Sequence, residues 1–354
     1  MKKTITTALT SSLIALGASS AIAQTTISGN LDLSYQALSA DTSTATGNSY
    51  RGFGKESQIN LANKGKLSNG IDYAAGFSWE IDGPDTLTTA AAIENHYIDF
   101  IFGKTTLSFS ADHVNTTDQT LTNIVGYGYT GGDGVGNMVS IYPKNLADNA
   151  AFGVGLTHDF GVLRATLNYI PNNEATASND VANSLVSTNV EGGTSSSQSL
   201  VVQGDLGVKG LNVLLGLKKQ EAKVSSTATA PKDQDGRRAS ISYNMGQFTV
   251  AADKIKFEGQ AGGGTTADVL LASELTGTSF GAAFAINKDL SLGAYYAKAD
   301  SDRAGTVDEK IKAVAIGYNL GPVTIQAQYR DIENNSGAET LDGKIGGVKI
   351  STKF

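Results

Sequence analysis

The chain has 354 residues, with 27 Lys and Arg against 34 Asp and Glu, which gives a formal net charge of −7. It contains no cysteine, so disulfide scaffolds, thiolate metal sites and cysteine nucleophiles are excluded. The basic residues are scattered, so the sequence offers no electrostatic footprint for binding nucleic acid. The three histidines have no partner at zinc-ligand or catalytic spacing, and we expect neither a resident cofactor nor an enzyme.

Residues 1–23 have the features of a secretory signal peptide. Lys2 and Lys3 precede a short apolar stretch, and Ala21, Ile22 and Ala23 form a small-residue cleavage site. A membrane anchor is the alternative, but the stretch is rich in Thr and Ser and falls short of the roughly 20 apolar residues that span a bilayer. We therefore predict cleavage after Ala23 and one mature domain over residues 24–354.

The rest of the chain consists of short segments in which apolar and polar residues alternate, the pattern of β-strands with two different faces. The clearest segment covers residues 71–81, where Tyr73, Phe77 and Trp79 share one face and Ser78 and Glu80 the other. We predict sixteen strands, over residues 25–36, 51–62, 71–81, 93–102, 106–112, 149–159, 162–170, 198–206, 211–223, 236–245, 247–258, 278–287, 290–298, 310–320, 323–332 and 338–354.

The connections between these segments alternate between tight turns and long polar loops. The longest loops cover residues 113–148, 171–197, 224–235 and 259–277. After residue 23 no apolar run is long enough for a membrane helix, so an exported chain of this kind can cross a membrane only as a closed barrel. The sequence therefore predicts an all-β fold, a sixteen-stranded antiparallel transmembrane barrel with short turns at one end and long loops at the other.

The chain ends inside a strand, with Val348, Ile350 and Phe354 on one face. Together with residues 59–80 and 97–112, this ending resembles the general diffusion porins of Gram-negative outer membranes. The resemblance implies an outer-membrane barrel, usually a homotrimer, that passes ions and small hydrophilic solutes by passive diffusion. It also implies that the third extracellular loop, here 113–148, folds into the lumen, and that the outer-membrane insertion machinery reads Val348, Ile350 and Phe354.

The charges expected in the pore depart from that family's pattern. Its members often carry wall arginines opposite acids of the inward loop, whereas this chain has Gln58 on the second strand and no arginine at the end of the fifth strand, which reads Ser110, Ala111, Asp112. We place Asp112, Asp118 and Asp133 at the constriction. The pore-wall candidates are Asp32, Arg51, Lys55, Gln58, Glu80, Arg164, Arg238 and Arg330, with Arg51 and Lys55 as substitutes for the missing arginines. The acidic balance predicts mild cation selectivity.

Three further readings stay open at this point. Carboxylates near Asp112 are candidates for a calcium site, although their spacing matches no EF-hand loop. A substrate-selective channel would have the same architecture and would differ by a conductance that saturates with solute. An exported adhesin or structural β protein would share the alternating strands but would never span a membrane.

Overall fold

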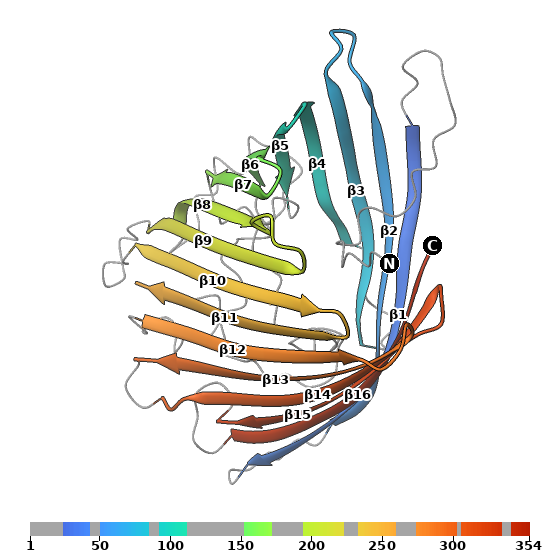
Figure 1. The fold of residues 1–354 in the computed structure, drawn as a ribbon, viewed down its shortest axis with the longest axis vertical. Helices are drawn as coiled ribbons and strands as arrows, with labels where there is room; N and C mark the ends of the chain where they lie inside the picture. Colours follow the sequence, from blue (N-terminus) through green and yellow to red (C-terminus); the bar gives the residue numbers. More distant parts are fainter. Residues whose placement is uncertain are drawn as a thin grey trace.

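The computed structural model describes residues 24–42, 50–84, 92–111, 152–171, 194–222, 233–259, 274–302, 306–334 and 341–354, which form a closed antiparallel barrel (Figure 1). The strands are β1 (Gln24–Thr42), β2 (Tyr50–Lys66), β3 (Asp72–Pro84), β4 (Ala92–Phe102), β5 (Thr105–Ala111), β6 (Phe152–Asp159), β7 (Leu163–Ile170), β8 (Thr194–Gly204), β9 (Leu211–Ala222), β10 (Gln234–Met245), β11 (Phe248–Glu258), β12 (Glu274–Ala285), β13 (Leu290–Ser301), β14 (Glu309–Asn319), β15 (Val323–Glu333) and β16 (Leu341–Lys353). The predicted sixteen-stranded fold is confirmed. Within the described ranges, no helix is long and apolar enough to cross a membrane.

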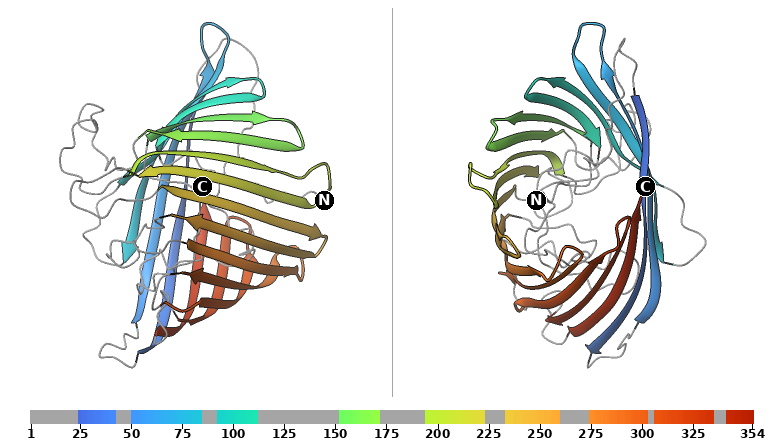
Figure 2. Two further views of the ribbon diagram at one scale, coloured as in Figure 1. Left: turned by 90° about the vertical axis from the view of Figure 1, so that its left-hand side faces the viewer. Right: turned by 45° about the vertical axis from the view of Figure 1, so that its right-hand side comes forward.

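Each strand pairs with its neighbours in the sequence, and β1 pairs with β16 to close the ring (Figure 2). The closure extends to the last residue: the Gly29 N–H donates to the Phe354 carbonyl at 2.8 Å, and the Phe354 N–H donates to the Gly29 carbonyl at 3.0 Å. A Cβ on Gly29 would lie 2.6 Å from the Phe354 ring, so the ring lies across this glycine. Because glycine has no Cβ, the Phe354 ring can pack directly against the backbone of residue 29.

The short-turn end is built from one repeated local motif. At four turns an Asp or Asn is followed two residues later by a glycine with positive φ, whose N–H donates to the Asx side chain. The pairs are Asp159 with Gly161, Asp205 with Gly207, Asn244 with Gly246, and Asn319 with Gly321. These turns hold consecutive strands close together, as the sequence predicts for the tight connections.

The outer face of the barrel carries a belt of exposed apolar side chains at the turn-end half of the strands. On β10 the belt is formed by Ala239, Ile241, Tyr243 and Met245, with Ile241 48% exposed. The facing residues of β14 are Val314, Ile316 and Tyr318, and those of β16 include Val348 and Ile350. Such a surface suits lipid rather than water, because contiguous apolar patches of this extent are rare on soluble proteins.

The belt gives a direct test of sidedness on neighbouring residues of β10. Ile241 points outward, whereas Ser242 is half-buried on the inner face. We expect Ile241→Arg to lower the free energy of unfolding by about 2–4 kcal/mol, because it places a charge in hydrocarbon. Ser242→Arg should cost much less. Urea unfolding of the refolded barrel in lipid vesicles measures both, and equal costs at the two positions would contradict this orientation.

Candidate pore wall

The strand register assigns most predicted pore-wall residues to the inner face. Directly opposed residues on paired strands point to the same side of a sheet. Gln58 is opposite Asn30 and Glu80 on neighbouring strands, and Asp32 alternates with the outward Leu31 and Leu33. The same alternation turns Arg164, Arg238 and Arg330 inward. The structure thus places these six residues on the inner face.

Arg51 and Lys55 lie on the outer face, so the prediction that they line the pore is wrong. Lys55 is opposite Leu33, an outward residue 52% exposed, and Arg51 has the same parity on β2. Between them Phe53, 65% exposed, contacts the ring of Tyr35 at a centroid distance of 5.2 Å. The strand alternates with period two, so both cations follow Phe53 outward rather than Gln58 inward.

The three candidate constriction acids, Asp112, Asp118 and Asp133, lie outside the described residues, as do residues 1–23 and the inward fold expected of loop 113–148. The assembly residues are described: Val348 and Ile350 face outward and Phe354 is 67% exposed. No cluster of three metal-ligating side chains occurs within the described ranges.

An inner-wall network on β2, β3 and β4 is built around Glu80. Gln58 donates to the Glu80 carboxylate, and Asn95 Nδ2 donates to the same carboxylate at 2.9 Å and to Ser78 Oγ at 2.7 Å. Asn95 reaches these atoms because the β3–β4 register shifts at this level and Asn95 takes a φ of 55°, as expected for a β-bulge. Because these donors are neutral, they position the carboxylate without cancelling its charge.

A second inner cluster lies across β10 and β11. Arg238 Nε donates to Asp253 Oδ1 at 2.7 Å, and Ser240 Oγ donates to the same oxygen. The side chains of Arg238 and Asp253 are both 0% exposed, so this ion pair is fully covered although it faces inward. Arg330 on β15 is also covered, at 4% exposure. Both arginines therefore face the interior without offering a solvated charge.

The accessible charge of the described wall is acidic on β2–β4. Gln58, Glu80 and Glu94 are half-buried there, and Glu94 is opposite the inward Ser78. In the closed sixteen-strand order, β2 stands opposite β10, so these acids face the sector that holds Arg238. On β1 and β16, Lys349 Nζ pairs with Asp32 Oδ2 at 3.0 Å, and this pair retains 15% and 11% side-chain exposure.

The inner face also holds an apolar cluster that the sequence reasoning missed. It lies at the loop-end half of β11–β16 and β1 and comprises Leu38, Ile255, Phe257, Tyr295, Ala297, Ala299, Ile311, Ala313, Ile332 and Ile345. Ile255 is fully buried, at 0% exposure. This sector is therefore packed rather than lined by water, because removing apolar side chains from water lowers the free energy of the folded state.

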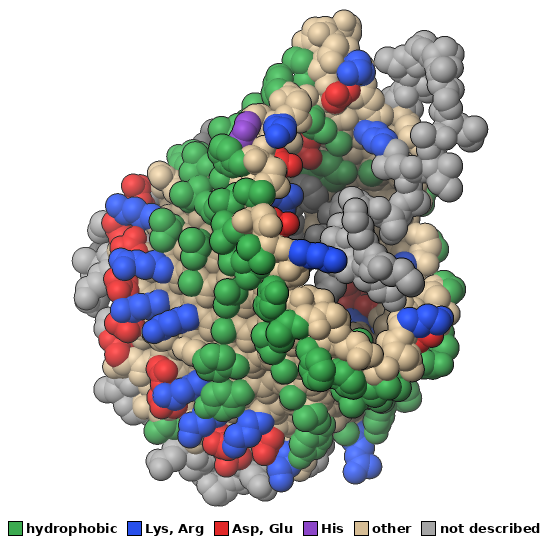
Figure 3. Space-filling view, viewed as in Figure 1, with side chains coloured by type: hydrophobic (Ala, Val, Ile, Leu, Met, Phe, Trp, Pro, Cys, Tyr) green, Lys and Arg blue, Asp and Glu red, His purple; other side chains and the backbone are tan. Residues whose placement is uncertain are grey.

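A signal for this inversion is present in the sequence. On β11, Lys254, Lys256 and Glu258 alternate with Ile255 and Phe257. One face of this strand segment is therefore fully charged and the opposite face is apolar. A rule that turns every apolar set toward lipid would place those lysines in the lumen. The structure instead turns them outward at the loop end, beyond the belt. Figure 3 shows Lys, Arg, Asp and Glu side chains gathered along one margin of the outer surface, beside the hydrophobic side chains.

Comparison with known proteins agrees with this geometry. A family model described as Gram-negative porin matches residues 8–338. The anion-selective porin from Comamonas acidovorans has a similar structure, with a TM-score of 0.65 at 16% identity over 94% of this chain and 100% of that one. A mutant of the Rh. blastica porin gives a TM-score of 0.60 at 13% identity over the same shares. No curated protein sequence matches this chain.

Proposed function

This chain belongs to the Gram-negative porin family and forms an outer-membrane channel for passive diffusion, and we propose that the channel passes ions and small hydrophilic solutes with a mild preference for cations. The observation that carries the proposal is the closed sixteen-stranded barrel with an apolar belt outside and half-buried polar groups inside. Barrels of sixteen strands are wide enough to leave an aqueous channel. The family and fold are those of channels without enzymatic activity, and we infer none for this chain.

The cation preference follows from which charges a solute can approach. Arg238 and Arg330 are covered, and Arg238 is matched by Asp253, whereas Glu80 and Glu94 are half-buried on the opposite side. Arg164 is the exposed inward arginine, and it lies directly opposite the acid Asp159 on β6. The loop acids Asp112, Asp118 and Asp133 would add to this negative potential at the constriction. The Comamonas acidovorans porin is anion-selective, but at 16% identity it supports the fold alone.

Reversal potentials under a KCl gradient test the selectivity. We expect the wild type to prefer K⁺ mildly, and the preference to weaken as salt rises because the Debye length is only about 10 Å at 0.1 M. Neutralising Asp112, Asp118 and Asp133 together should reduce the preference, and Glu80→Gln should reduce it further. The matched control is Asp331→Asn, which removes one negative charge from the outer face. An anion-preferring wild type, or no shift in any inner variant, would overturn the proposal.

Two finer points belong to the same proposal. We infer a homotrimer, inserted by the outer-membrane assembly machinery, because both accompany the porin architecture; heat-modifiable migration of the unheated and heated protein tests the trimer. We also favour general diffusion over a substrate-selective channel of the same architecture. A conductance that saturates with one solute would decide for the selective channel.

A further inference from the structure

The outer charges at the loop end of β9–β16 follow a fixed order. Along six of these eight strands, the first charged side chain beyond the apolar belt is basic. These residues are Lys219, Arg237, Lys254, Lys298, Lys312 and Lys344. Acids follow farther from the belt: Glu221, Asp235, Glu258, Asp300, Asp308 and Asp342. On the other two strands, β12 and β15, the first charged side chain is an acid, Glu274 or Asp331.

Ion pairs connect these basic residues with the acidic residues farther from the belt. Some of the cations have close carboxylate partners, and others do not. Lys256 Nζ lies 2.8 Å from Glu258 and 3.0 Å from Glu274, and Lys298 pairs with Asp300 and Asp308. The hydrogen bond from Lys298 holds the pKa of the Asp308 carboxyl below its usual range, so that acid stays ionised. These lysines are therefore largely matched by protein carboxylates.

Arg237 and Lys254 are matched less well. Arg237 Nη2 lies 3.9 Å from Glu258, a long contact, and its side chain is 65% exposed. Lys254 is exposed, and no carboxylate of the described residues forms an ion pair with it. Two cations on neighbouring strands thus present charge outward at the upper edge of the belt.

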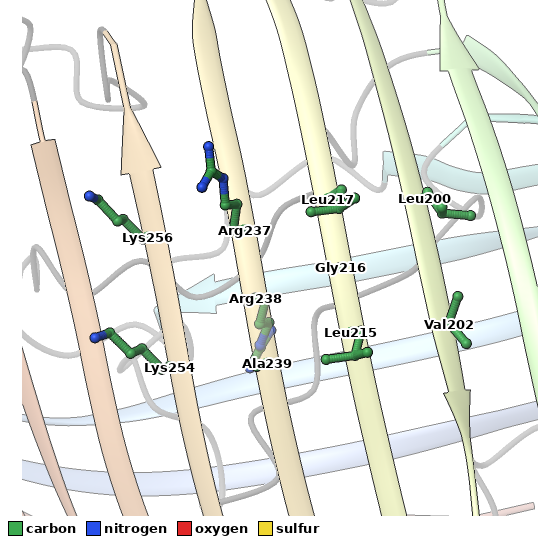
Figure 4. Close-up of a pocket in the computed structure, with 10 residues that line it drawn as sticks. All are labelled: Leu200, Val202, Leu215, Gly216, Leu217, Arg237, Arg238, Ala239, Lys254 and Lys256. Carbon is green, nitrogen blue, oxygen red and sulfur yellow. The ribbon is translucent and has the colours of Figure 1, made fainter. Parts of the chain in front are cut away.

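Directly beside these two cations the outer wall is hollowed. The hollow has a volume of about 460 Å³ and lies over β8–β11, lined on its apolar side by Leu200, Val202, Leu215 and Leu217 and on its polar side by Arg237, Lys254 and Lys256 (Figure 4). Leu215 and Leu217 are 57% and 55% exposed, so they belong to the lipid-facing belt. An occupant of this hollow would meet hydrocarbon-like surface on one side and three cations on the other, of which Lys256 is already paired with Glu258 and Glu274.

We propose that this hollow binds a phosphate-bearing lipid of the surrounding leaflet, with its phosphate between Arg237 and Lys254 and an acyl chain along Leu200, Leu215 and Leu217. The phosphates of a leaflet lie just outside its hydrocarbon, the level at which these cations stand. A guanidinium and an ammonium recognise phosphate through charge-assisted hydrogen bonds, which are stronger at the edge of the low-dielectric belt than in water. The proposal goes beyond the channel function and does not depend on ion selectivity.

Native mass spectrometry of the detergent-purified folded protein tests the site, with phosphatidic acid as probe and diacylglycerol of the same chains as its uncharged counterpart. We expect phosphatidic acid to bind at least about tenfold more tightly, as one or two charge-assisted hydrogen bonds provide. Arg237→Gln with Lys254→Gln should abolish most of that difference. The matched control, Lys104→Gln with Lys288→Gln, removes two exposed cations at the opposite, short-turn end and should leave it unchanged.

The outcomes separate the proposal from its competitors. Equal binding of the two lipids, or an unchanged preference in the Arg237 and Lys254 variant, overturns it. If millimolar inorganic phosphate binds at Arg237 and Lys254 while phosphatidic acid does not, the site would be assigned to free phosphate instead. Loss of oligomers in that variant would show that this face is a contact between copies of the chain instead. If the double variant folds poorly, Lys254→Gln alone should still reduce the preference, and single-channel conductance of the same samples reports the channel function independently.

Discussion

Deletion of Phe354 is expected to reduce sharply the amount of folded barrel in the outer membrane while leaving secretion of the chain intact. Phe354 makes the last pair of β1–β16 hydrogen bonds, with Gly29 as partner, and its exposed ring lies against that glycine. Loss of the residue removes both the closing bonds and the terminal aromatic that we infer the insertion machinery reads. An unclosed edge in lipid leaves backbone groups unpaired, which costs several kcal/mol for each.

Membrane fractionation with heat-modifiability of the barrel measures this effect. Gly29→Val should act in the same direction, because a Cβ at this position would lie 2.3 Å from the Gln58 carbonyl oxygen. Lys353→Ala is the matched control, since it alters the adjacent inward residue and keeps both the chain length and the aromatic end. Normal yield of heat-modifiable barrel after removal of Phe354 would contradict the closing role of this residue.

Replacement of Asp253 by Asn is expected to lower the free energy of unfolding by about 3–5 kcal/mol, the usual cost of breaking a fully buried ion pair from one side. The change keeps the shape of the side chain but removes the charge of the carboxylate that pairs with the Arg238 guanidinium, which is 0% exposed. Ser240 Oγ, which donates to the same carboxylate, loses a strong acceptor as well. Denaturant unfolding of the barrel refolded into vesicles, followed by Trp79 fluorescence, provides the measurement.

Asp32→Asn is the matched control for this prediction. Its partner Lys349 is also on the inner wall and the ion pair is 3.0 Å long, but both side chains retain some exposure. Water can therefore solvate Lys349 when the carboxylate is lost, and the cost should be clearly smaller. Similar losses in the two variants would show that the burial of the Arg238–Asp253 pair does not set its contribution.

The sequence by itself determined the architecture. Alternation with period two identifies strands wherever one face is apolar, and it located all sixteen, from the first at Gln24–Thr42 to the last at Leu341–Lys353. The short connections between the alternating segments marked the tight turns, and the structure finds glycines with positive φ there, as at Gly161 and Gly246. The aromatic C-terminus indicated closure. These are local properties of the chain, so local sequence was enough to predict them.

The tertiary structure decided which face points inward at the loop end and which charges meet. Alternation separates two faces without saying which is inner, and above the lipid belt the preference reverses: Ile255 turns inward and Lys254 outward. The pairing of Arg238 with Asp253 and the meeting of Asn95 with Glu80 depend on the register of neighbouring strands and on a bulge. Burial also removes the Arg238 charge from contact with the pore solvent. No single strand encodes this burial, because solvent access depends on everything that packs around a side chain.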